Sequence, residues 1–268
     1  MDKQAITAAQ SSEINDRSTQ ESAPARDDLI IGRNPVMEAI RSGRTLDKLL
    51  VTRSASGAAK AIIAKCSERG VPIKEVSAKK LDFLSGGGNH QGVALFVASH
   101  EYCSVEDILN TAAQRNEDPF IIICDELEDP HNLGAIIRTA EAVGAHGVII
   151  PKRRSVSLSG TVAKAASGAL EYVKVARVTN LVNEMDALKE RGVWIYGADM
   201  NGEDWSTVDY SGGCALVIGS EGSGISRLVA EHCDRIVSLP MKGKINSLNA
   251  SVAAGVLMYE VARQRNLK

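Results

Sequence analysis

Three segments far apart in the chain combine glycine, carboxylates and small polar side chains, a composition suited to holding a ligand. They are residues 125–134 (DELEDPHNLG), followed by Arg138, then residues 219–224 (GSEGSG) and residues 240–249 (PMKGKINSLN). Glycine lets the backbone approach a ligand closely, and its amides and carbonyls can then read an adenine edge. Any one segment could be an ordinary turn, a helix cap or a solvated loop. Three of them together predict a nucleotide-like ligand.

The elements around these segments predict how they are positioned. Continuous apolar runs, typical of strands buried on both faces, occur at residues 120–124, 147–150, 193–198, 215–218 and 236–239. Helical stretches separate them at residues 132–143, 181–191, 225–232 and 248–265. This alternation predicts an α/β fold with an open parallel sheet and helices on both faces. Because ligands bind beyond the carboxyl ends of such strands, and each segment leaves a strand there, we expect the three to converge.

The first part of the chain has a different organisation. Residues 1–26 carry almost no large apolar side chains and are predicted to be a disordered tail. Helices at residues 35–42, 57–69 and 78–84 and strands at residues 49–52, 71–75 and 93–98 predict a small αβ domain over 27–98. A linker with one weak helix follows over 99–118, and a second domain over 119–268. Residues 27–98 hold eleven Lys and Arg against seven Asp and Glu, a net charge of +4. This charge favours an RNA-facing module, and a solvated basic face is the alternative.

Several classes of function find no support in the sequence. The segment from Gly219 has Ile225 where a phosphate-binding P-loop needs lysine, and its glycine spacing is not that of a dinucleotide fingerprint. The five cysteines form no Cys-x-x-Cys pair, and the histidines are scattered, so we expect reduced thiols and no metal. No apolar run approaches the roughly 20 residues of a membrane span, and the first residues lack a signal-peptide core. A cytoplasmic protein without a membrane partner is the expectation.

The three segments resemble the signature motifs of the SpoU (TrmH-type) branch of the SPOUT RNA methyltransferases. The matching residues are 129–134 with Arg138, 218–222 with Gly224, and 239–241 with 247–249, in the same order. Residues 31–36 with 38–39, and residues 90–93, resemble the L30e-like substrate-binding extension of the bacterial 23S rRNA guanosine 2'-O-methyltransferases. The resemblance therefore covers both halves of the chain.

This resemblance implies a carboxyl-terminal trefoil knot, S-adenosylmethionine as the cofactor, and a homodimer formed through the knot domain with an active site built from both subunits. The implied reaction is methylation of a ribose 2'-hydroxyl in RNA, with a guanosine of 23S rRNA as the first choice. A tRNA 2'-O-methyltransferase of the same superfamily is one alternative. A catalytically inactive RNA-binding assembly or resistance factor is another, although the intact set of Asn132, Arg138, Glu221 and Asn249 favours the enzyme.

The resemblance and the local charge together predict three groups of site residues. They are catalytic residues Asn132, Arg138, Glu221, Ser247 and Asn249, cofactor-binding residues Ile218, Gly219, Leu239, Met241, Leu248 and Asn249, and RNA-binding residues Arg33, Asn34, His90, Gln91, Lys152, Arg153, Arg154 and Lys164.

Arg138 has two possible roles. It is expected either to act as a rare neutral base or to remain charged, gripping a phosphate while another group takes the proton. Because a guanidinium, with a pKa above ~12, rarely loses its proton, we favour the second role. Asn132 is expected to position Arg138 or the target ribose, and Glu221 to orient Arg138 or the incoming nucleotide. For residues 152–154, a solvated basic turn is the alternative to a phosphate contact.

Overall fold

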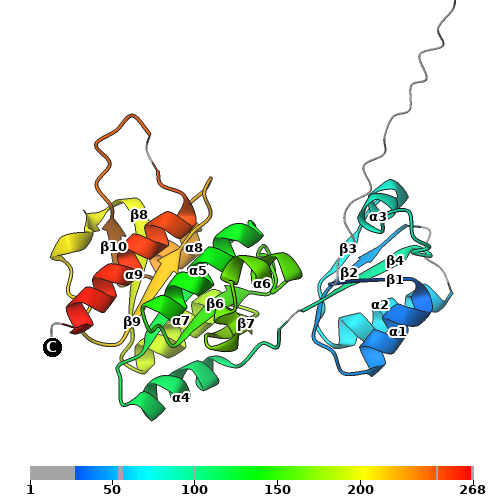
Figure 1. The fold of residues 1–268 in the computed structure, drawn as a ribbon, viewed down its shortest axis with the longest axis horizontal. Coiled ribbons are helices and arrows are strands. Elements are labelled where there is room, and N and C mark those ends of the chain that lie inside the picture. Colours follow the sequence, from blue (N-terminus) through cyan, green and yellow to red (C-terminus); the bar gives the residue numbers. More distant parts are fainter. Residues whose placement is uncertain (1–27, 54–56, 99, 246, 267–268) are drawn as a thin grey trace, which may run out of the picture.

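The computed structural model describes residues 28–53, 57–98, 100–245 and 247–266. Over these residues the chain forms two α/β domains joined by an extended segment (Figure 1). The tail predicted over residues 1–26 lies outside the described residues.

The first domain is a four-stranded sheet with helices on both faces. Its elements are β1 (Leu29–Ile31), α1 (Arg33–Arg41), β2 (Leu46–Val51), α2 (Ala58–Glu68), β3 (Ile73–Glu75), α3 (Ala78–Leu84) and β4 (Val93–Val97). The strand order is β1-β4-β2-β3, with β4 antiparallel to its neighbours and β2 parallel to β3. Val36 and Ile62 bring α1 and α2 onto one face, and Leu81 brings α3 onto the other.

The second domain contains a six-stranded, entirely parallel sheet of order β10-β8-β9-β5-β6-β7. Its strands are β5 (Phe120–Cys124), β6 (Gly147–Pro151), β7 (Lys174–Val178), β8 (Trp194–Asp204), β9 (Cys214–Ile218) and β10 (Arg235–Ser238). Its helices are α4 (Val105–Arg115), α5 (Pro130–Ala142), α6 (Gly160–Ala166), α7 (Leu181–Glu190), α8 (Arg227–Glu231) and α9 (Ala250–Asn266). The predicted open α/β sheet is thereby confirmed.

The helices cover both faces of this sheet because the central strands are apolar throughout. In β5, Ile122 points into a core formed with α5, α6 and α9, whereas Ile121 and Ile123 point into a core formed with α4, α7 and α8. All five residues of β5 are buried. A strand buried on both faces must read as a continuous apolar run, which is the pattern seen in the sequence.

Two elements of the second domain were not among the predictions. β7 is an edge strand with Lys174 exposed, which interrupts the apolar pattern, and α6 is only seven residues long. The helix α4 is the one expected within the linker, and Ser104 and Asp107 form a capping box at its start. Ile108 of α4 is fully buried against the sheet, so this helix packs as part of the second domain.

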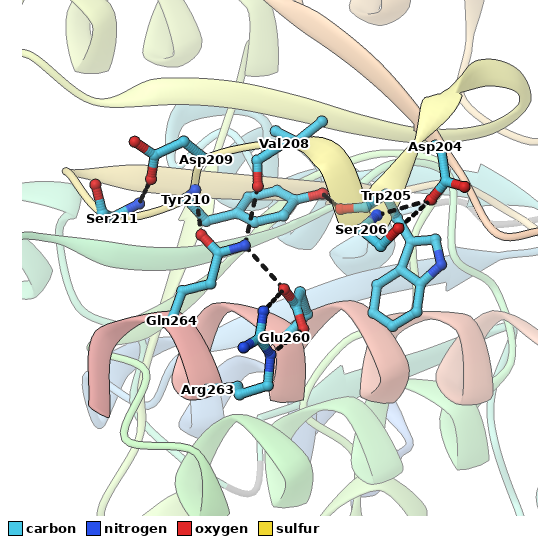
Figure 2. A network of polar contacts seen from close by, with 10 residues as sticks. All are labelled: Asp204, Trp205, Ser206, Val208, Asp209, Tyr210, Ser211, Glu260, Arg263 and Gln264. Carbon is cyan, nitrogen blue, oxygen red and sulfur yellow. Dashed lines mark hydrogen bonds and ion pairs between the residues drawn. The ribbon is translucent and has the colours of Figure 1, made fainter. Parts of the chain in front are cut away.

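The end of α9 is anchored by a polar network (Figure 2). Gln264 accepts a hydrogen bond from Tyr210 N (2.8 Å) and donates to Val208 O (2.9 Å) and Glu260 (2.8 Å). Arg263 makes two hydrogen bonds to Glu260, and this contact, above all, lowers the pKa of the Glu260 carboxyl. The network holds the last turns of α9 against the segment after β8.

Within the described residues, no helix is long and apolar enough to cross a membrane. The same part of the chain has no cluster of three His, Cys, Asp or Glu side chains suited to a metal ion. The cysteines are free, and Cys66, Cys124 and Cys214 are buried.

Candidate active site

The three polar segments meet at the carboxyl ends of β5, β9 and β10. Asn132 donates from Nδ2 to Glu221 Oε1 (2.9 Å) and accepts at Oδ1 from Asn249 Nδ2 (3.0 Å). Asn249 Nδ2 also donates to Glu221 Oε1. Asn132 and Glu221 are 89 positions apart in the chain, and Asn132 and Asn249 are 117 positions apart. The predicted convergence is therefore confirmed, in the form of a closed triangle of side chains.

Local sequence places two of these side chains at the starts of helices. Asp129 caps α5 by accepting from His131 N (2.9 Å), and Pro130 occupies the first helical position, which needs no backbone donor. Asn132 follows within the first turn and is 4% exposed. Asn249 caps α9 by accepting at Oδ1 from Ser251 N (3.0 Å), which leaves its Nδ2 free to donate to Asn132 and Glu221.

The segment after β9 is held in a tight turn. Ser220 and Gly224 exchange two backbone hydrogen bonds of 3.0 Å. Asp125, at the end of β5, is buried and accepts from Ser226 N at 2.7 Å, which ties the far side of the turn to the sheet. Gly219 lies beneath the turn, and a Cβ there would come closer than 3.0 Å to backbone atoms of Gly224 and Ile225. Only glycine fits at this position.

Two cavities open on either side of this turn. The first has a volume of about 280 Å³ and is lined by the turn, by the strand ends around Ala198 and Leu239, and by Leu248 and Leu257. The second has a volume of about 450 Å³ and is lined by residues 126–129, Asn132, Arg154, Ser220, Glu221 and Ser223. Because Ser220, Glu221 and Ser223 line both cavities, the turn forms a shared wall between them.

Five of the six predicted cofactor residues lie together in the first cavity. Its lining includes Ile218, Gly219, Leu239, Met241 and Leu248, together with the predicted catalytic residues Glu221 and Ser247. The sixth, Asn249, is not part of the lining and is hydrogen-bonded to Glu221 and Asn132.

Arg138 lies apart from this group. Its side chain is exposed on α5, donates from Nη1 to Ser167 Oγ (3.4 Å), and lines neither cavity. Asn132 and Glu221 contact each other and Asn249, and neither has a hydrogen bond to Arg138. Their expected roles towards the target ribose and the incoming nucleotide stay predictions, while within one chain neither Asn132 nor Glu221 positions Arg138 by a hydrogen bond. The reason is helix geometry, because positions six residues apart point to different sides of a helix.

The predicted RNA-binding residues fall into two places. In the second domain, Arg154 lines the second cavity and forms an ion pair with Glu126 (2.9 Å), Arg153 and Lys164 are exposed, and Lys152 is half-buried. In the first domain, Arg33 donates from its backbone N to Gln91 Oε1 (3.0 Å) and from Nε to Gln91 O (3.2 Å), and Asn34 is exposed.

His90 has a structural role in the same loop. Its Nδ1 accepts from Gly92 N (2.9 Å), its Nε2 lies 3.0 Å from Asp82, and its side chain is 14% exposed. His90 thus shapes the loop that carries Gln91, and has little surface left for a partner.

One group of residues in the first cavity was missed by the sequence analysis. Asp199, Met200 and Asn201 line it from β8, and Asp199 accepts two hydrogen bonds from Asn201. A signal for them was present, since they directly follow the apolar run at residues 193–198, as the other segments follow theirs. Applying the strand-end rule to every strand would have found them.

Comparison with known proteins decides the family. The sequence profile of the SpoU rRNA Methylase family matches residues 119–259, and that of the RNA 2'-O ribose methyltransferase substrate-binding domain matches residues 29–103. The chain belongs to the SpoU rRNA methylase family. Its activity class is thus that of the SpoU/TrmH RNA methyltransferases.

Relatives within the SpoU family match nearly the whole chain. The Bacillus subtilis protein YacO, described as a TrmH family tRNA/rRNA methyltransferase, is 52% identical over 241 residues, covering 89% of this chain and 96% of its own. A protein of Staphylococcus saprophyticus with the same description is 46% identical over 240 residues, covering 89% and 96%.

Solved SpoU structures show the same architecture. AviRb, a SpoU methyltransferase from Streptomyces viridochromogenes solved in complex with AdoMet, aligns with a TM-score of 0.57 and 26% identity, covering 90% of this chain and 91% of its own. The TrmH/SpoU tRNA-modifying enzyme of A. aeolicus aligns with a TM-score of 0.51 and 30% identity, covering 56% of this chain and 77% of its own. The first comparison spans both domains, whereas the second spans little more than one.

Proposed function

We propose that this protein transfers a methyl group from S-adenosylmethionine to a ribose 2'-hydroxyl of ribosomal RNA, with a guanosine of 23S rRNA as the target. The observation that carries the proposal is the Asn132–Glu221–Asn249 triangle, which stands where the two cavities share a wall. One cavity receives the methyl donor and the other receives the target nucleotide, so the shared wall is where the reacting atoms meet.

The first cavity suits the methyl donor in both shape and charge. Ile218, Leu239 and Leu248 supply apolar walls for an adenine ring, and the backbone of the 219–224 turn supplies amides and carbonyls for its edge. The carboxylates of Asp199 and Glu221 line the same space and complement a cationic ligand. When bound, S-adenosylmethionine supplies an electrophilic methyl group carried on a positively charged sulfur.

The protein contributes positioning and charge to this reaction. Glu221 accepts from both Asn132 and Asn249, so its carboxylate is held in one orientation towards the shared wall. Pre-oriented polar groups accelerate displacement reactions because they need not reorganise during the reaction. A protein that had lost its activity would have no reason to keep this triangle complete, which favours the enzyme over an inactive RNA-binding factor.

Arg138 of one chain contributes to the methyl-transfer site of a second copy of the chain. Val252, Val256 and Tyr259 are exposed by 50%, 36% and 59%, and their spacing places them on one face of α9. The neighbouring residue Gly255 lies beside Thr139 of α5, next to Arg138. A homodimer formed through this apolar face buries it and brings Arg138 to the partner's site.

In the dimer, Arg138 remains charged and binds the phosphate next to the target ribose, where it stabilises the developing alkoxide. The proton then passes to a phosphate oxygen or to water. The carboxyl-terminal trefoil knot stays a prediction. Ser247 and Asn249 fix the loop that receives the methionine end of the cofactor and the sugar.

The substrate-binding domain favours rRNA over tRNA. It occupies residues 29–103, and the tRNA-modifying enzyme of A. aeolicus matches only 56% of this chain, whereas the rRNA methyltransferase of Sinorhizobium meliloti matches 88% with a TM-score of 0.53 and 25% identity. The basic charge of this domain adds a second reason, because phosphate contacts dominate affinity for RNA.

The test incubates the protein with methyl-labelled S-adenosylmethionine and with naked 23S rRNA, assembled large subunits or bulk tRNA. A 2'-O-methyl group blocks alkaline cleavage at its own position, so mapping the resistant position identifies both the atom and the nucleotide. We expect one resistant guanosine in rRNA. Label on a base, or label only in tRNA, would overturn the proposal.

A further inference from the structure

The two domains are joined by a buried ion pair as well as by the linker. Arg177 of β7 donates from Nη1 to Asp47 Oδ1 of β2 at 2.5 Å and from Nη2 to Asp47 O at 3.1 Å. The Asp47 residue is 1% exposed and the Arg177 side chain is 10% exposed. Among the described side chains, this is the one ion pair between the elements β1–β4 or α1–α3 and the second domain.

The linker itself contributes a third group to this contact. Tyr102 donates from its hydroxyl to Asp47 Oδ1 (3.2 Å) and accepts from Leu158 N (2.8 Å). Its ring lies under the Arg177 guanidinium, 5.2 Å from the ring centroid to Cζ. The three side chains therefore connect the first domain, the linker and the second domain at one point. We call Asp47, Tyr102 and Arg177 the interdomain joint.

The joint lies between basic side chains of the two domains. Arg177 also donates to Lys152 O (3.4 Å), which fixes the start of the basic segment at residues 152–154. On the other side, Lys48 directly follows Asp47 in β2 and lies within electrostatic range of Lys74 and of Glu128, which lines the second cavity. One guanidinium thus sets the position of basic residues from both domains relative to that cavity.

Stability alone does not explain a joint of this kind. Taking two charges out of water is costly, and apolar side chains of similar size often serve as well or better. What this pair adds is direction, because Arg177 donates to a carboxylate oxygen and to the backbone carbonyl of Asp47 at the same time. A joint built this way holds two domains in one relative orientation, where an apolar contact would allow sliding.

We propose that Asp47, Tyr102 and Arg177 are positioning residues that hold the substrate-binding domain in one orientation over the methyl-transfer site, and so set the affinity for RNA without touching the reacting groups. This inference rests on the proposed function. RNA bound by both domains at once gains from their being held in place, since the second contact then costs little additional entropy.

The test compares the full-length protein with Arg177→Met and with the double variant Asp47→Leu/Arg177→Met. The double variant leaves no unpaired buried charge, so it is expected to fold and to melt close to the wild type. Both variants should raise KM for rRNA by about tenfold or more, because loss of a fixed geometry removes the gain from two linked contacts. The dissociation constant of S-adenosylmethionine and kcat at saturating RNA should stay within about twofold, and small-angle scattering should show a larger radius of gyration.

The matched control is Arg191→Met. Arg191 pairs with Glu106 at 2.7 Å within the second domain, so its substitution removes a close ion pair without touching the joint. We expect KM for rRNA and the radius of gyration of this variant to equal those of the wild type. Joint variants with wild-type KM and radius of gyration would overturn the inference, as would a matching rise in KM in Arg191→Met.

Failure of the proposed function gives a different result. If the wild type methylates no rRNA ribose, the proposed function is wrong, and the joint is then judged by the radius of gyration and by direct binding of 23S rRNA. Weaker binding together with a larger radius in the double variant supports the joint in that case. Unchanged values of both refute it.

Discussion

Gly219→Ala is the substitution for which the structure makes its sharpest prediction. A Cβ at this position would approach Gly224 C, Gly224 O and Ile225 N more closely than 3.0 Å. These atoms belong to the backbone, so no side-chain rotation relieves the overlap. The turn must move away from β9, which breaks or stretches the two 3.0 Å hydrogen bonds between Ser220 and Gly224.

The size of the effect follows from this geometry. Overpacking at a tightly packed position costs about 1–3 kcal/mol. Because the turn lines the first cavity, moving the turn to relieve the overlap should weaken the binding of S-adenosylmethionine by a similar free energy. At about 1.4 kcal/mol per factor of ten, affinity should fall by about 5-fold to 150-fold.

The measurement is isothermal titration calorimetry with S-adenosylmethionine, and circular dichroism checks the fold. The control is Gly212→Ala, because a Cβ at Gly212 has no heavy atom within 4 Å and Gly212 lines neither cavity. Gly212→Ala should therefore bind S-adenosylmethionine within about twofold of the wild type, since an unhindered surface substitution changes stability by less than about 0.5 kcal/mol. Equal affinities for the two variants would refute the assignment of the first cavity to the cofactor.

Four further predictions follow from the site and its support. Arg138→Ala should abolish methyl transfer while S-adenosylmethionine binding, followed by calorimetry, stays within about threefold, and near wild-type turnover would remove Arg138 from the mechanism. Asn249→Asp keeps the cap of α9 but faces Glu221 with a like charge; we expect a melting temperature near that of the wild type and a fall in kcat of about tenfold or more. Burial lowers the pKa of His146 below 6.5. The stabilising contribution of its neutral imidazole is therefore present above that pH and disappears as pH falls through the folded-state pKa. In His146→Asn, which retains an acceptor for a backbone amide, the melting temperature should fall less than that of the wild type between neutral and acidic pH. Neutralising residues 152–154 should reduce the slope of log affinity for rRNA against log salt by about 0.7–0.9 for each phosphate that these residues neutralise in the wild type, and an unchanged slope would exclude this segment from the interface.

Much of the fold and the site could be predicted because the relevant signals are local. The run Phe120–Cys124 is apolar at every position, so it had to be buried on both faces, and a sheet of such strands is parallel. Parallel strands place their carboxyl ends at one edge of the sheet. The proximity of Asn132, Glu221 and Asn249 could therefore be predicted from the sequence. The edge strand β7 was not predicted because Lys174 and Arg177 interrupt its apolar pattern, as an edge position permits.

The sequence by itself determined which side chains follow the strands, and therefore the family and the composition of the cavities. Only the tertiary structure decided how those side chains pair. Asp47 and Arg177 are 130 residues apart and meet because two domains dock, an event that no periodicity encodes. Arg138 shares a helix with Asn132, yet helical geometry turns it to another side, onto Ser167. Local pattern decides the conformation of each element, whereas partner choice depends on packing between elements distant in the chain.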